Sequence, residues 1–211
     1  MEPFRTLEAI AVPLDEVNLD TNQLCPTRFN KVPRGPGYER ILFHDRRFDA
    51  QGNEKSDFIL NREPYRRAQI IVAERNFGCG SSRESAVYAL HAFGIRSIVA
   101  PSFGDIFVSN CFKNGLLPIR VPADVAAGLR RQLHAQLGAT VKVDLAQQTV
   151  TDPDGRTHGF DIHPMRKRCL LEGLDDISLT QRYRAEFDAF EARYRPDVPW
   201  LFGGGKGGGS L

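Results

Sequence analysis

Residues 76–86 join a short apolar run to a helical pattern, and this junction constrains the fold more than any other part of the sequence. The run at 69–73 is apolar enough for a buried strand, and residues 76–83 read Asn-Phe-Gly-Cys-Gly-Ser-Ser-Arg. Gly78 and Gly80 permit positive φ angles and a close approach of the backbone. The sequence therefore predicts a strand, a tight turn rich in glycine and serine, and then a helix.

The helix and the strand after it have recognisable limits. Ser81 and Glu84 have the spacing of a capping box, so we expect the helix to begin at Ser81. Apolar residues then recur at helical spacing up to Phe93, and Gly94 is suited to end the helix. Residues 95–100 are typical of the next strand. A strand–helix–strand unit of this kind predicts neighbouring parallel strands in an α/β domain.

The remaining sequence predicts a mixed sheet with flanking helices. Further strands are expected at 6–11, 116–121, 141–143, 149–151 and 157–162, and further helices at 103–114, 125–137, 164–172 and 179–194. Residues 31–40, rich in proline, glycine and charge, predict a mobile loop. Residues 203–209 are six glycines and one lysine and predict a disordered segment. We therefore expect one domain over 1–200 and a Gly-rich disordered tail over 201–211.

Charge and hydropathy exclude several classes of function. Lys and Arg total 28 against 26 Asp and Glu, so the net charge of +2 predicts no nucleic-acid partner. No apolar run approaches the ~18 residues of a membrane helix, and no signal peptide is recognisable, so we expect a soluble, cytoplasmic protein without a membrane partner. Arg-rich places such as Arg46 and Arg47 are expected on the surface.

The four cysteines, at positions 25, 79, 111 and 169, are far apart in sequence. Iron–sulfur ligation normally involves at least one close pair of cysteines, and a disulfide framework shows regular spacing. The sequence therefore predicts no metal and no cofactor bound by this chain itself, and no disulfides.

The predicted turn is suited to bind a small anion. Backbone N–H groups, serine hydroxyls and the Arg83 guanidinium would converge at a helix N-terminus, whose dipole favours negative charge. The Walker motif is absent, and the dinucleotide motif fails because Arg83 stands where a third glycine is required. The simpler alternative is that Ser81 only caps the helix and Arg83 is solvated. Two glycines followed by Ser-Ser-Arg favour a site for a carboxylate or phosphate.

Residues 76–84 resemble the signature of the small subunit of 3-isopropylmalate dehydratase, a family related to the mobile domain of aconitase. Segments at 20–29, 100–118 and 168–177 resemble the same family in the same order, so the resemblance covers about residues 5–195. It implies an aconitase-type swivelling β/β/α domain with a mixed sheet and flanking helices. It also implies a hydro-lyase that interconverts 2-isopropylmalate and 3-isopropylmalate by dehydration and rehydration in leucine biosynthesis.

The resemblance also implies roles for particular residues and a partner. Ser81 would be the catalytic base, acting as an alkoxide, and Arg83 would bind a substrate carboxylate. The further residues that would bind substrate are Gly80, Ser82, Asp20, Thr21, Asn22 and Arg28. Hydroxide departure would depend on a [4Fe–4S] cluster in a large subunit, so the implied partners are that subunit and a small substituted malate.

Two positions depart from the family pattern. Asn22 stands where the family usually has aspartate, and Ser85 stands where it usually has histidine. The changes remove one carboxylate and one group that titrates near neutral pH, but they leave Ser81 and Arg83 in place. A related hydro-lyase acting on citramalate (2-methylmalate) or a homoaconitate-type acid is therefore an alternative, as is a non-catalytic binding protein of the same fold.

Overall fold

The computed structural model describes residues 1–80 and 83–202 and divides the chain into two compact units. The first unit is Met1–Leu174, and the second is Asp175–Leu211. The predicted disordered segment at 203–209 lies outside the described residues, whereas helix α9 (Pro199–Phe202) includes the first two residues of the predicted tail. No helix in the described ranges is both long enough and apolar enough to cross a bilayer.

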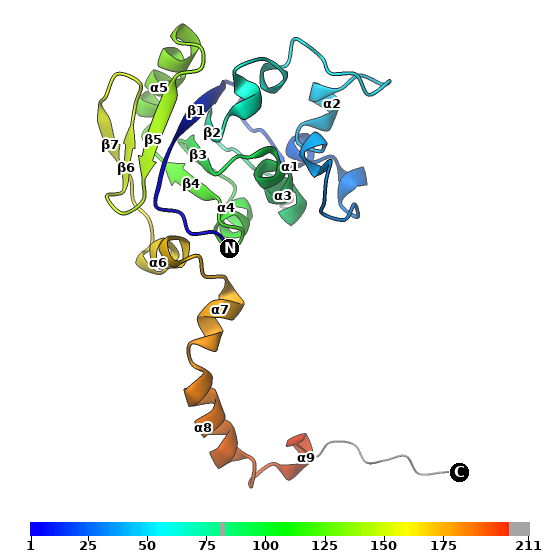
Figure 1. Ribbon diagram of the computed structural model, residues 1–211, viewed down its shortest axis with the longest axis vertical. Coiled ribbons are helices and arrows are strands. Elements are labelled where there is room, and N and C mark those ends of the chain that lie inside the picture. The colour runs from blue at the N-terminus through cyan, green and yellow to red at the C-terminus, as the bar shows by residue number, and fades with distance from the viewer. Residues whose placement is uncertain (81–82, 203–211) are drawn as a thin grey trace. The chain divides into compact units, whose positions relative to one another are not determined.

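The first unit is built on a mixed sheet, in which seven strands are described, in the order β4-β3-β2-β1-β5-β6-β7 (Figure 1). The strands are β1 (Thr6–Leu14), β2 (Ile70–Ala73), β3 (Ser97–Ala100), β4 (Leu117–Arg120), β5 (Thr140–Asp144), β6 (Thr149–Thr151) and β7 (Thr157–Gly159). Strands β1 to β4 pair in parallel, and β5 to β7 extend the sheet from β1 in antiparallel register. The predicted α/β class and mixed sheet are confirmed.

The helices of the first unit are α1 (Thr21–Leu24), α2 (His44–Arg47), α3 (Glu84–Phe93), α4 (Asp105–Lys113), α5 (Ala123–Ala135) and α6 (Pro164–Glu172). Short 3₁₀ turns are η1 (Thr27–Phe29), η2 (Tyr38–Arg40), η3 (Ile59–Asn61) and η4 (Tyr65–Arg67). The second unit contains α7 (Asp176–Gln181) and α8 (Arg184–Tyr194) besides α9. The single helix predicted at 179–194 is therefore wrong, because the chain forms two helices there.

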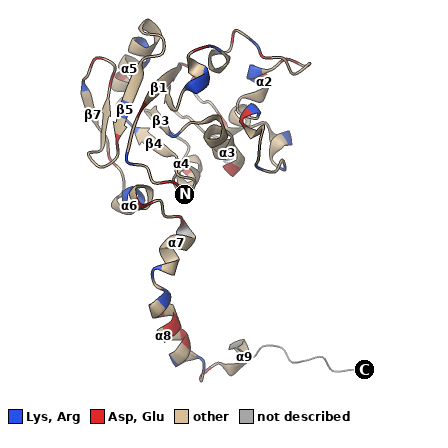
Figure 2. Ribbon diagram, in the orientation of Figure 1, with Lys and Arg blue, Asp and Glu red and all other residues tan. Residues whose placement is uncertain are grey.

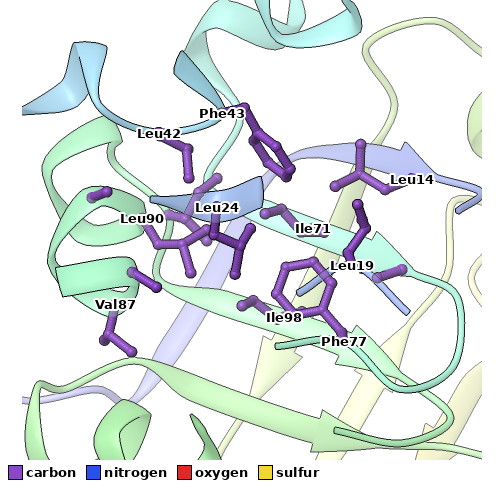
Figure 3. Packing of buried hydrophobic residues seen from close by; sticks show 14 of the residues in the cluster. Leu14, Leu19, Leu24, Leu42, Phe43, Ile71, Phe77, Val87, Leu90 and Ile98 are labelled. Atoms are coloured by element: carbon purple, nitrogen blue, oxygen red, sulfur yellow. The ribbon is translucent and has the colours of Figure 1, made fainter. Parts of the chain in front are cut away.

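The parallel strands are buried on both faces and separate two apolar cores. Because successive side chains of a strand point to opposite faces, Ile71 of β2 packs into one core while Ile70 and Val72 pack into the other. Figure 3 shows the first core, where Ile71 lies with Val87 and Leu90 of α3. The second core contains the apolar face of α5. This burial explains why the strands are continuous apolar runs.

Helix α3 begins three residues later than the sequence predicts. Its N-cap is Arg83, which makes no side-chain capping bond, and Glu84 is the first helical residue. A capping box would put Glu84 at the third helical position, so the start of the helix differs from the predicted one, and the predicted cap, Ser81, lies outside the described residues. A capping box forms instead on α1, where the Asp20 carboxylate accepts from Gln23 N at 2.8 Å and Gln23 Oε1 accepts from Asp20 N at 2.9 Å.

Arg47 contradicts the expectation that the arginines at 46–47 lie on the surface. Only 4% of Arg47 is exposed, and its burial lowers the pKa of its guanidinium. The Nε group donates to Asn61 Oδ1 at 2.9 Å, and Nη1 donates to the Glu39 carbonyl at 2.8 Å. Because a buried charge is stable only with polar partners, these bonds fix the segment between η2 and η3.

Candidate functional site

The glycine-rich turn lies at the carboxyl ends of the parallel strands. It follows β2 and is held on one side by the chain after β1, where Gly78 N donates to Leu19 O at 2.7 Å and Thr21 N donates to Cys79 O at 3.1 Å. On its other side, Phe77 N donates to Ser102 O after β3 at 3.1 Å. Ligands of open α/β sheets bind at this end of the strands, so the turn stands at the favoured position.

Both predicted glycine positions have a positive φ angle, +70° at Gly78 and +84° at Gly80. Gly78 is also enclosed, because a Cβ atom there would lie within 3.0 Å of three atoms of the Phe107 ring. Gly80 is exposed and lies against Asp20, whose Cβ would be 3.7 Å from an added Cβ. The turn therefore requires glycine at 78 for its space as well as for its conformation.

Gly78→Ala is expected to destabilise the chain by about 2–5 kcal/mol, of which ~1–2 kcal/mol is left-handed strain and the remainder is the clash with Phe107. Gly52→Ala is a matched control, since Gly52 has a φ of +84° but nothing within 4 Å of an added Cβ. The control should lose only the strain. Urea unfolding of both variants measures the difference, and equal losses would show that Phe107 does not enclose the turn.

Arg83 is held by two neutral acceptors from the N-terminal segment. Its Nη1 donates to Asn22 Oδ1 and, at 2.9 Å, to Thr27 Oγ1, and the Thr27 hydroxyl donates to Asn22 Oδ1 at 2.8 Å. The structure thus brings the predicted residues Asn22 and Arg83 together. Neutral acceptors fix the guanidinium without cancelling its charge, whereas an aspartate at position 22 would form an ion pair with it.

A hollow opens beside Arg83, between α3 and the loop predicted at 31–40. Its lining residues are Asn30, Val32, Pro33, Arg34, Tyr38, Arg83, Glu84, Ser85 and Tyr88. The Arg34 guanidinium lies 4.0 Å from the centre of the Tyr88 ring, and Ser85 Oγ donates to Asn30 Oδ1 at 2.9 Å. A hydrogen bond from Asn114 lowers the pKa of the Glu84 carboxyl. The hollow therefore combines two guanidinium groups, one carboxylate and apolar walls.

Thr27, Asn30 and Arg34 belong to the site in the structure but are not among the site residues predicted from the sequence. Thr27 and Asn30 follow the N-terminal motif closely in sequence, and Arg34 is in the Pro- and Gly-rich loop. Their position in or next to these two segments is the only feature of the sequence that could have indicated a role in the site. Their contacts with α3 arise only from the tertiary fold.

The other predicted site residues have different surroundings. Thr21 is buried and joined to Cys79 through its backbone, and Asp20 caps α1. Arg28 donates from Nη1 to Asp45 Oδ2 at 3.0 Å, and this guanidinium lowers the pKa of the Asp45 carboxyl. Ser81 and Ser82 lie outside the described residues, in the sequence between Gly80 and Arg83. Contact of any of these residues with a substrate stays a prediction.

The described residues contain no group of three or more His, Cys, Asp or Glu side chains placed to hold a metal ion. All four cysteines belong to the described part of the chain and are free thiols. Burial raises the pKa of the Cys25 and Cys111 thiols, so both stay protonated at neutral pH. These thiols therefore lack the thiolate form that metals and electrophiles require.

Known proteins of one family match this chain along nearly its whole length. The family model of the aconitase C-terminal domain matches residues 1–124, and a model described as LeuD_N matches residues 127–164. The 3-isopropylmalate dehydratase small subunits of Roseobacter denitrificans and Dinoroseobacter shibae are 48% and 49% identical over 201 residues, which are 95% of this chain and the whole of each relative.

A solved structure supports the same fold. The crystal structure of 3-isopropylmalate dehydratase (LeuD) from Methanocaldococcus jannaschii superposes with a TM-score of 0.62 at 24% identity, over 87% of this chain and 99% of that one. The aconitase-type fold predicted from the sequence is therefore confirmed. With the full-length identities above, these findings show that the chain belongs to the family of 3-isopropylmalate dehydratase small subunits.

Proposed function

We propose that this chain is the small subunit of a 3-isopropylmalate dehydratase and acts in the interconversion of 2-isopropylmalate and 3-isopropylmalate. The observation that carries the proposal is Arg83, a guanidinium fixed by neutral acceptors beside a glycine-rich turn at the carboxyl ends of parallel strands. Identity of 46–49% to dehydratase small subunits over nearly the full length supports the same assignment. Both substrates are dicarboxylates and require a fixed cation.

The reaction needs a base that removes a proton from the carbon beside a carboxylate. We assign this role to Ser81, whose hydroxyl is far too weak an acid to ionise without nearby donors and cationic charge. Backbone N–H groups of the turn, the N-terminus of α3 and Arg83 supply these. Arg83 binds a substrate carboxylate, ideally through two parallel hydrogen bonds. Further contacts are assigned to Gly80, Ser82, Asp20, Thr21, Asn22 and Arg28.

The walls of the hollow favour a branched apolar substituent. Val32 and Pro33 of the loop contribute hydrocarbon to the lining of the hollow, which also includes Arg83 and Ser85 from the start of α3. An isopropyl group buries more apolar surface against such a wall than the methyl group of citramalate, by about 0.8 kcal/mol for each CH₂. This difference favours isopropylmalate over the smaller substrate.

Hydroxide is a poor leaving group, and its departure requires a Lewis acid. The proposed enzyme obtains one from the [4Fe–4S] cluster of a large subunit, so the active form is a heterodimer. We place the enzyme in the cytoplasm, a reducing compartment that suits four free cysteines.

A related hydro-lyase remains the second candidate because of Asn22 and Ser85. With asparagine at 22, the positive charge of Arg83 is not neutralised by its neighbour, which would strengthen binding of a more highly charged acid of the homoaconitate type. A binding protein without turnover would use the same cation.

Reconstitution tests these alternatives. The chain is mixed with its co-encoded large subunit, with the cluster intact, and ultraviolet absorbance of the unsaturated acid is followed. Turnover of 3-isopropylmalate with a kcat/KM at least about tenfold above that for citramalate and homoaconitate is expected. A reversed preference would establish the second candidate. A stable complex that turns over none of these acids would refute the proposed activity and favour the alternative of a binding protein without turnover.

A further inference from the structure

Helix α8 carries an aromatic face, and no residue of this helix is buried. Tyr183, which precedes the helix, and Phe187, Phe190 and Tyr194 within it are 39–50% exposed. Their spacing of four, three and four residues places them on one side of the helix. The Phe190 and Tyr194 rings stack with their centres 5.2 Å apart. These four side chains form what we call the aromatic face.

The rest of α8 is alanine and charged residues, with two arginines against three carboxylates and thus no excess of positive charge. Arg184 bonds to Asp188 at 3.1 Å, and Arg195 contacts Glu191 at 3.8 Å, each at helical spacing of four residues. Figure 2 shows both signs of charge on this helix. Nucleic acids and anionic lipid surfaces attract helices with an excess of Lys and Arg, so neither is a suitable partner. The aromatic face is left as the feature that a partner can recognise.

The size of the face indicates what kind of interface it joins. An aromatic side chain buries roughly 150–250 Å² in total, so four that are about half exposed leave on the order of 400 Å² to cover. A stable interface buries about 800 Å² on each partner. Contact between two copies of this face alone would therefore be too small for a stable dimer. The face is suited to extend a larger interface made with another protein.

The alignment with relatives places α8 within the shared chain. A stretch of 201 residues in a chain of 211 must contain residues 11–201, and it matches relatives over their whole length. Helix α8 is therefore part of what this chain shares with proteins named small subunits. An isolated helix of 11 residues is marginal in water, so a surface that covers the aromatic face would stabilise it.

We propose that the aromatic face of α8 docks on the large subunit of the dehydratase and contributes affinity to the heterodimer. This inference rests on the proposed function, which supplies the large subunit. Docking through α8 leaves Arg83 and the glycine-rich turn chemically unchanged, so loss of the face weakens assembly and not the chemical step.

Two double variants of the full chain test the proposal. Phe187→Glu/Phe190→Glu puts two carboxylates on the aromatic face, and Ala185→Glu/Ala192→Glu puts the same two charges on the opposite side of the same helix. Each variant is titrated into the cluster-loaded large subunit, and the apparent Kd and the kcat at saturation are obtained from turnover. The aromatic variant should raise Kd at least about 30-fold with kcat retained, and the control should change Kd less than about threefold.

The outcomes separate the docking from the activity itself. If the wild-type enzyme is active and both variants bind the large subunit with the wild-type Kd, the docking surface is overturned and the proposed function stays intact. Absence of wild-type assembly and turnover refutes the proposed function, and the docking with it. Equal weakening by both variants assigns the effect to charge and also overturns the proposal.

Radical footprinting identifies what covers the face. Phe187, Phe190 and Tyr194 should be oxidised in the isolated small subunit and protected after addition of the large subunit. Protection already present in the isolated chain would mean that another part of the chain or a second copy covers the face, and either would overturn the proposal. Sedimentation of the isolated chain distinguishes those two cases.

Discussion

Ser81→Ala is expected to lower the kcat of the reconstituted dehydratase about 10⁴-fold and to change KM by less than about threefold. A positioned base contributes roughly 10²–10⁴ to a rate, and Ser81 is assigned the proton transfer that begins dehydration. Alanine removes the oxygen that accepts the proton but leaves Arg83 to bind the carboxylate. Substrate binding and proton abstraction should therefore separate in this variant.

The measurement combines steady-state kinetics with exchange of the substrate proton into deuterated water, followed by NMR. Both dehydration and exchange should be lost in Ser81→Ala, since both require the same base. Ser56→Ala is the control, because Ser56 is exposed and has no assigned contact with the substrate. It should keep kcat within about fivefold. Exchange at the wild-type rate in Ser81→Ala would assign the base to another residue.

Local sequence was sufficient to predict the elements that surround the site. The apolar run before Asn76 and the glycines at 78 and 80 indicate a strand and a turn through short-range sterics, and both glycines have positive φ angles in the structure. The parallel strand–helix–strand unit followed from the same segment. Such features depend on residues close together in sequence, so they can be predicted from the sequence.

The start of α3 depended on contacts that local sequence does not contain. The backbone of the turn is bonded to Leu19 and Thr21 after β1 and to Ser102 after β3. These bonds fix the path of the chain into α3, which begins at Glu84 although Ser81 has the better local signal. The cap of α1 is local by contrast, because Asp20 and Gln23 are only three residues apart in sequence.

The burial of Arg47 could not be predicted from local sequence either. Arg47 is neighboured by Arg46 and His44, a pattern typical of a solvated surface, yet its bonding partners are Asn61 and the carbonyls of Glu39 and Leu42. The link from Arg83 to Thr27 is of the same kind, since the two residues are in segments that only the fold brings together. Partners of long polar side chains are set by tertiary structure, so their prediction requires coordinates.

Arg83→Gln is expected to lower kcat/KM for 3-isopropylmalate about 10³-fold, and Arg83→Lys about 10²-fold. Each hydrogen bond from a charged donor contributes roughly 1.5–3 kcal/mol, and a bidentate pair with carboxylate contributes two. Glutamine removes the charge and the paired geometry, whereas lysine keeps the charge as a single point. The loss should fall mainly on KM in Arg83→Lys.

The matched control is Arg66→Gln, which removes one guanidinium from an exposed ion pair with Glu54 and changes the net charge equally. It should leave kcat/KM within about threefold. Chemical rescue then separates binding from folding, since added guanidinium ions should restore at least about tenfold of the activity lost in Arg83→Ala. If guanidinium ions do not restore activity, Arg83 acts only on the fold, through Asn22 and Thr27, and the substrate carboxylate binds elsewhere.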